Sequence, residues 1–116
     1  MGLKTTNYFI KDLGLLLPEA YALIKDINVS GNYGQATFIT QSSRENAEQV
    51  LDGGKMRALE TTTIDFIVNR NENDRVTAYH KAKELIQETI VLPNGEFDTI
   101  WINGPFTGWE DDLIEE

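Results

Sequence analysis

The side chains that carry enzyme chemistry are few in this chain, and they are not spaced as a catalytic site requires. His80 is the only histidine, and no serine or aspartate stands at a motif spacing that would make it a catalytic base. Ser30, Ser42 and Ser43 lie outside any Gly-x-Ser-x-Gly turn that would expose a nucleophile. We therefore expect no catalytic residues, and a protein that is not an enzyme.

Two further patterns contain residue types found in ligand sites, but neither has the spacing that such a site needs. Gly53-Gly54 stands in an acidic loop rather than at a strand-to-helix turn, which argues against a phosphate cradle. Glu110, Asp111 and Asp112 are adjacent carboxylates without the alternate spacing and glycine turn of a calcium loop. Cysteine is absent, which excludes thiolate metal sites and disulfides. The expectation is no metal site and no cofactor.

Large aromatic residues gather near the end of the chain. Trp101, Phe106 and Trp109 lie within nine residues of one another and precede a run of carboxylates that includes Asp111 and Asp112. Aromatic side chains on an irregular segment often anchor protein interfaces. We expect these five residues to form an interaction surface. The alternative is that Trp101 belongs to the core of a sheet and that Phe106 and Trp109 cap its end.

Charge and composition limit the class of partner. The 116 residues are 41% hydrophobic, which suits one globular domain over 1–116, and the net charge is −9. A field of this sign repels phosphate backbones, so nucleic-acid binding is disfavoured. Apolar runs such as residues 15–18 are too short to cross a bilayer, so we expect no membrane association and a cytoplasmic location. Five acidic residues and no basic one in 110–116 predict an acidic C-terminal tail.

Hydrophobic periodicity predicts an α+β domain. Apolar spacings of three to four favour a helix over 5–17 that Pro18 ends, and a longer apolar stripe favours a second helix over 76–90 with an Asn or Asp N-cap. Alternating patterns indicate strands, and a polar stretch between two of them indicates a long loop. The strands expected from alternation are 36–41, 58–68 and 97–102. The pattern of 20–27 fits either a helical turn or a strand, of which we favour the strand, and the expected loop, with room for a helical turn, is 41–57. The expected fold has two main helices packed on one face of a mostly antiparallel sheet of about four strands.

From residue 34 to residue 108 the order of these segments resembles a known family. The strand 36–40, the Leu51-Asp52-Gly53 turn, the strand 62–68 and a helix bearing Ala78-Tyr79 are similar to the minor capsid and tail-terminator proteins of tailed bacteriophages and prophages. The resemblance implies a non-enzymatic subunit that forms ring-like homo-oligomers at the head–tail junction and contacts other head–tail proteins. It also implies assembly in the host cytoplasm and a final place in the virion.

A second hypothesis comes from the charge alone. A small acidic interaction protein, such as an inhibitor or nucleic-acid mimic from a mobile element, would present its carboxylates to a basic partner. Such binding weakens steeply with ionic strength, whereas assembly through sheet edges and aromatic residues does not. Salt dependence therefore separates the two hypotheses.

Overall fold

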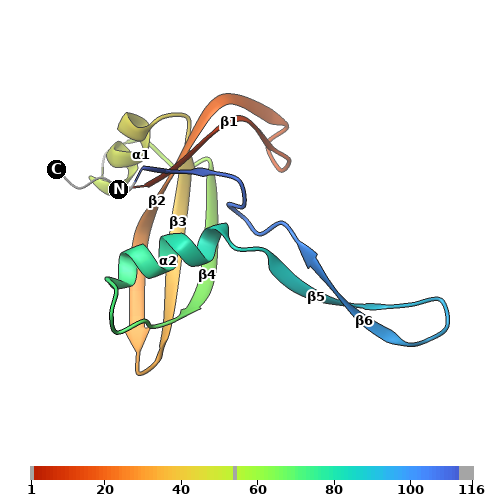
Figure 1. The fold of residues 1–116 in the computed structure, drawn as a ribbon. Coiled ribbons are helices and arrows are strands. Elements are labelled where there is room, and N and C mark those ends of the chain that lie inside the picture. Colours follow the sequence, from red (N-terminus) through yellow and green to blue (C-terminus); the bar gives the residue numbers. More distant parts are fainter. Residues whose placement is uncertain (1, 54, 113–116) are drawn as a thin grey trace.

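The chain forms a five-stranded antiparallel sheet, and a separate two-stranded ribbon projects from it (Figure 1). The computed structural model describes residues 2–53 and 55–112. In the large sheet the strands lie in the order β4-β3-β2-β1-β7, and β5 pairs with β6 in the ribbon. The bounds are β1 (Gly2–Ile10), β2 (Leu15–Ser30), β3 (Tyr33–Gln41), α1 (Arg44–Leu51), β4 (Glu60–Ile67), α2 (Asp74–Lys83), β5 (Ile86–Val91), β6 (Phe97–Ile102) and β7 (Glu110–Asp112).

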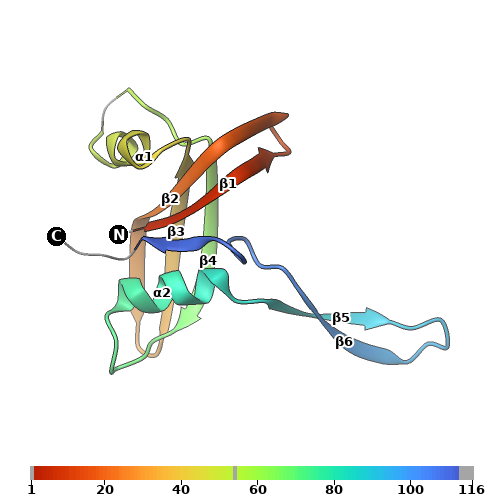
Figure 2. The ribbon, with the colours of Figure 1, turned by 45° about the horizontal axis from the view of Figure 1, so that its top comes forward.

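The two helices cover opposite faces of the large sheet. Successive side chains of a strand point to opposite faces; in β2, Ile24 packs in the cluster that contains Tyr79 of α2, and Leu23 packs in the cluster that contains Ala47 of α1. Figure 2 shows strands lying between α1 and α2. The expected arrangement, with both main helices on one face of about four strands, is therefore wrong. The described residues contain seven strands and one short helix on each face of the sheet.

The predicted helix over 5–17 is a β-hairpin formed by β1 and the start of β2. Its helix-like spacing has a structural cause at Asn7, which has a left-handed φ of 53° and stands across from Pro18 in the hairpin. Leu17 and Ala20 belong to the same core cluster although they are three positions apart in the sequence. A regular strand would place them on opposite faces. The strands therefore change their buried side at this point, and the apolar residues recur at helical intervals.

The second expected helix, 76–90, is also partly wrong. It begins as expected, because the Asn73 side chain caps it by accepting a hydrogen bond from the Arg75 N–H at 2.9 Å, but it ends at Lys83. The residues beyond it form β5, which pairs with β6 across a turn. Ile86 and Ile90 are four residues apart, a spacing that fits both a helix face and a strand face. Pairing with β6 decides between the two.

The strands expected from alternating patterns lie in β3, β4 and β6, and the segment 20–27, whose pattern fits a helical turn or a strand, lies in β2. The polar segment 41–57 contains α1, capped by the Ser43 hydroxyl, which accepts a hydrogen bond from the Asn46 N–H at 3.1 Å. Of the expected acidic tail, residues 110–112 form β7, and residues 113–116 lie outside the described residues.

The hydroxyl of Tyr79 connects α2 to an irregular point of the sheet. The register between β2 and β3 shifts between Ile24 and Asp26, and the Ile24 N–H donates to the Tyr79 hydroxyl at 3.0 Å. The Tyr79 ring is buried and meets Phe38 edge-on, with ring centroids 5.4 Å apart. One side chain therefore holds a helix against the sheet and satisfies a buried donor at the bulge.

We expect Tyr79→Phe to lower the free energy of unfolding by about 1–3 kcal/mol, because the Ile24 N–H loses its acceptor in a buried site. Tyr33→Phe is the matched control: the Tyr33 ring is exposed, so the change should stay within about 0.5 kcal/mol. Urea denaturation of both variants measures the difference. Equal effects of the two substitutions would contradict this role for Tyr79.

Candidate interaction surface

The strands β5 and β6 form an arm, residues 86–102, that extends away from the large sheet (Figures 1 and 2). The arm is a regular antiparallel pair whose register runs from Ile86 opposite Ile102 to Val91 opposite Phe97. A turn around Gly95, which has a φ of 85°, joins the two strands. Its position places most of the arm outside both hydrophobic clusters of the subunit.

The register divides the arm into two faces, because directly paired residues of an antiparallel ribbon share a face. We call one the charge-free face; its residues are Gln87, Thr89, Val91, Phe97, Thr99 and Trp101. We call the other the isoleucine face; its residues are Ile86, Glu88, Ile90, Asp98, Ile100 and Ile102. Each face thus carries at least three large apolar side chains. A ribbon with one face in solvent would have polar side chains on that face, and neither face of the arm has this composition.

Exposure of these side chains is high. The exposed fraction is 75% for Phe97, 65% for Val91 and 63% for Trp101. An isolated two-stranded hairpin is marginally stable in water, and three or more strands or a packing partner are needed to stabilise it. Contiguous exposed apolar surface of this kind marks interaction sites. The arm therefore exposes apolar surface that the other described parts of the subunit leave uncovered.

The base of the arm is fixed to the subunit by hydrogen bonds around Thr107. The Thr107 hydroxyl accepts from the Gly104 N–H at 2.8 Å and donates to the Glu84 carbonyl at 3.1 Å, which ties together the two ends of the arm. A Cβ at Gly104 would lie 2.4 Å from that carbonyl oxygen, so only glycine fits there. The Phe106 N–H donates to the Ala82 carbonyl at 3.1 Å. The arm therefore leaves the core in a defined direction.

Three of the expected interface residues separate in the structure. Trp101 lies exposed on the arm, whereas Phe106 and Trp109 are buried in the main core. The Phe106 ring lies 5.1 Å from Phe38 and 4.9 Å from Trp109, and Trp109 meets Tyr8 edge-on at 5.1 Å, all between ring centroids. Burial leaves Phe106 and Trp109 no free ring surface for a partner. Trp101, which the alternative placed in the sheet core, is the aromatic of the three that faces solvent.

The two expected acidic interface residues, Asp111 and Asp112, lie on β7 and make contacts within the subunit. Asp111 forms an ion pair with Lys83 of α2 at 3.0 Å. Asp112 accepts a hydrogen bond from the Tyr21 hydroxyl at 2.5 Å and lies 3.6 Å from the Arg44 guanidinium of α1. These contacts connect β7 to both helices.

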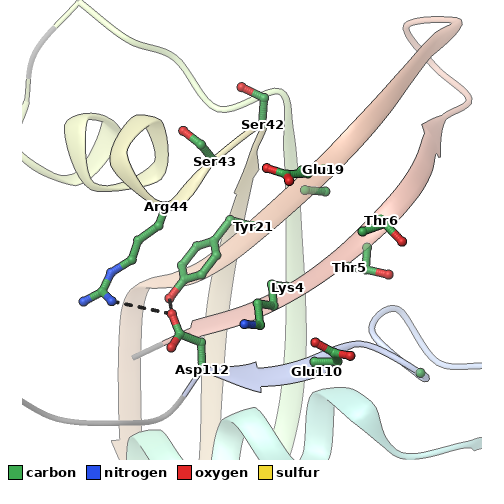
Figure 3. A pocket seen from close by; sticks show the side chains of 12 residues that line it. Lys4, Thr5, Thr6, Glu19, Tyr21, Ser42, Ser43, Arg44, Glu110 and Asp112 are labelled. Atoms are coloured by element: carbon green, nitrogen blue, oxygen red, sulfur yellow. Dashed lines mark hydrogen bonds and ion pairs between the residues drawn. The ribbon is translucent and has the colours of Figure 1, made fainter.

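A hollow of about 580 Å³ lies beside the contact of Asp112 with Tyr21 and Arg44 (Figure 3). Its walls come from β1, β2, β7 and the start of α1. Its charged lining residues are Lys4, Glu19, Arg44, Glu110 and Asp112. Carboxylates and cations are mixed along its wall, and Figure 3 shows Tyr21 and Arg44 both directed at Asp112. Arg44 and Asp112 thus pair with each other in the wall of this hollow.

The pKa values at this contact follow from the pairing. The hydrogen bond from Tyr21, aided by the charge of Arg44, holds the pKa of Asp112 below its usual range despite opposing desolvation. Burial, followed by the bond to Asp112, raises the pKa of the Tyr21 hydroxyl. Asp112 is therefore an ionised acceptor at neutral pH, and Tyr21 is a neutral donor.

Within residues 2–53 and 55–112, no cluster of three or more His, Asp or Glu side chains is arranged to hold a metal ion. In the same part of the chain, neither helix has the length and apolar character needed to cross a bilayer.

Sequence reasoning missed most of the arm surface. The sequence patterns do not identify Val91 and Phe97 as exposed surface residues, and they place Ile86 and Ile90 in the helix expected over 76–90. The signal that identifies them is the pairing of residues 86–91 with 97–102 around the Leu92-Pro93-Asn94-Gly95 turn. This pairing places apolar residues on both faces of the two-stranded arm.

We expect Tyr21→Phe to lower the free energy of unfolding at pH 7 by about 1–2 kcal/mol, because Asp112 loses a charge-assisted hydrogen bond. The pKa of Asp112 is lowered by folding, so its contribution is present above the unfolded-state pKa and is lost as the pH falls through the folded-state pKa. The difference in free energy of unfolding between the wild-type protein and the variant should therefore become smaller below about pH 4. Urea denaturation across this pH range measures it.

Asp112→Asn provides the control for that prediction, because the effect of Tyr21→Phe should be smaller when the carboxylate is already absent. A gap that stays constant down to low pH, or an undiminished effect in the Asp112→Asn background, would contradict the pairing.

Comparison with known proteins gives no family for this chain: no family model matches it, and no curated protein and no solved structure is significantly similar to it.

Proposed function

We propose that this protein is a non-enzymatic structural subunit that assembles with copies of itself. The observation that carries the proposal is the arm, which projects from the subunit with apolar side chains exposed on both of its faces. Such a ribbon gains its stability from a third strand or a packed surface. Each copy that joins the assembly can supply such a surface to the arm of its neighbour.

The contacts of Asp111 and Asp112 favour this role over that of an acid-presenting inhibitor. Asp111 and Asp112 contact Lys83, Arg44 and Tyr21 within the subunit. Carboxylates used in this way are not displayed as a row for a basic partner. The charge-free face of the arm exposes Val91, Phe97 and Trp101 instead, which suits an assembly interface.

The resemblance to minor capsid and tail-terminator proteins extends the proposal to a biological setting. In that setting the subunit forms a ring-like homo-oligomer at the head–tail junction of a tailed bacteriophage or prophage and contacts other head–tail proteins. It assembles in the host cytoplasm and remains in the virion. A head-to-tail interface relates each subunit to the next by a rotation. The assembly closes into a ring when a whole number of these rotations makes one full turn.

We expect the purified protein to self-associate as its concentration rises, and we expect Phe97→Thr/Trp101→Thr to weaken that association by about tenfold or more. Both rings are exposed, and threonine keeps the strand propensity of the arm, so the stability of the subunit should change little. Sedimentation velocity over a concentration series measures the association, and urea denaturation measures the stability.

Phe106→Ala is the contrasting variant, because Phe106 is in the core. It should lower the free energy of unfolding by about 3–5 kcal/mol. Association of the wild-type protein should persist in about 0.5 M salt, since apolar contacts and strand pairing are weakly screened. A protein that stays monomeric at every concentration would overturn the proposal. Association that weakens steeply as the salt concentration rises would favour the acidic interaction protein.

A further inference from the structure

We infer that the arm of one copy adds to the open edge of β4 in the next copy, so that the five-stranded sheet continues into the neighbour's two-stranded arm. The inference rests on the proposed self-assembly and names the surfaces that make the contact. It commits to a second copy of this chain as the partner.

The edge of β4 is available for a further strand. In the large sheet β4 is the terminal strand on one side, with eight residues, and β7 is the terminal strand on the other, with three. The Val68 N–H donates to the Asn32 carbonyl at 2.9 Å, in the register that links β4 to β3. Because antiparallel residues alternate between bonding to one side and to the other, the odd-numbered residues of β4 direct their amides outward. Thr63 and Asp65 are central among them.

A groove runs along this edge between β4 and α2. Two hollows lie there, and both are lined by Asp65 of β4 and by Lys81 and Glu84 at the end of α2. One continues towards Ile67, and the other reaches the base of the arm at Trp101. An open strand edge beside a helix is the geometry in which proteins accept an added strand.

The two faces of the arm suit the two sides of this edge. Ile64 of β4 points to the α2 side, where it packs on the main core, so the isoleucine face of an added arm would meet apolar surface there. On the other side, Ile67 and its cross-strand partner Tyr33 are 71% and 72% exposed. The charge-free face, with Phe97 and Trp101, would cover these two side chains. A strand added in this orientation buries apolar surface on both sides at once.

The charges along the groove are mixed. Its lining includes the carboxylates Asp65, Glu72 and Glu84 and the basic residues His80 and Lys81. Lys81 pairs with Glu84 at 3.0 Å, but both side chains are about half exposed, so that pair is weak and can be shared with a carboxylate of the isoleucine face. Apolar complementarity rather than charge points to a second copy as the partner, because one chain carries both the open edge beside Ile67 and the arm with Phe97 and Trp101.

The groove and the arm of a single subunit are continuous at Trp101, which lines one hollow and belongs to the charge-free face. A neighbour's arm in the groove would therefore also touch the base of the resident arm. Each copy then gives one arm and receives one, which is a head-to-tail contact of the kind that generates rings.

Engineered cysteines test the contact directly, because the chain has none of its own. Thr63 lies on the face of β4 opposite α2, and Thr89 and Thr99 lie on the charge-free face of the arm. In the inferred orientation these side chains share one face of the joined sheet, where cross-strand Cβ atoms approach to about 4.5–5.5 Å, close to the range of a disulfide. Mixing Thr63→Cys chains with Thr89→Cys or Thr99→Cys chains under mild oxidation should yield a covalent heterodimer.

Glu88→Cys is the matched control, because Glu88 is on the same arm but on the isoleucine face. Mixed with Thr63→Cys chains, it should cross-link at least about tenfold less than the better of the two threonine positions. Equal yields from both faces, or no heterodimer with either threonine position under conditions in which sedimentation shows association, would overturn the inference and leave the proposed self-assembly standing. A protein that stays monomeric throughout would overturn both.

Thr63→Pro gives an independent measurement. Proline removes an outward amide of an edge strand without removing a bond to β3, so association should weaken by about tenfold or more while circular dichroism of the subunit is retained. If this variant does not fold, the cysteine experiment decides alone. A folded Thr63→Pro protein that associates as well as the wild type would count against strand addition at β4.

Discussion

The packing of Phe106 in the core is the interaction on which the rest of the structure depends. Its ring lies between Phe38 of β3 and Trp109, and its N–H donates to the Ala82 carbonyl of α2. Through Trp109 this contact reaches Tyr8 at the far hairpin. One buried ring thus links the central sheet, the helix and the segment that returns from the arm. Because the arm ends only a few residues before it, anchoring Phe106 also fixes where the arm leaves the molecule.

The arm differs from the rest of the subunit in how it is stabilised. The large sheet has a helix and apolar clusters on each face, whereas the arm has backbone pairing and exposed apolar side chains on both faces. Hydrogen bonds at its base, through Thr107 and Gly104, set its direction. Pairing along a two-stranded ribbon does not by itself offset the entropy of ordering it. The proposed function follows from this imbalance, because in it the surface of a neighbouring copy supplies the missing burial.

Sequence patterns predicted the strands whose side chains alternate regularly, and they failed where long-range pairing overrides local spacing. The hairpin of β1 and β2 changes its buried side at Asn7 and Pro18, which made its apolar residues recur like those of a helix. Ile86 and Ile90 fit a helix or a strand equally well, and contact with β6 decides between them. The aromatic cluster near the end of the chain was recognised, but nothing local distinguishes Trp101, which is exposed, from Phe106, which is buried. That difference depends on the turn that folds the chain back onto the core after the arm.

Amide hydrogen exchange at low and high protein concentration tests the central claim most directly, because it reports on each backbone N–H separately. We predict that amides of the arm exchange rapidly in the dilute monomer, whereas those of β2 and β3 are protected. On assembly, the arm and the outward amides of β4, at Thr63 and Asp65, should gain protection together. Protection of the arm that is already full in the dilute monomer, or that does not change when the protein associates, would contradict the account.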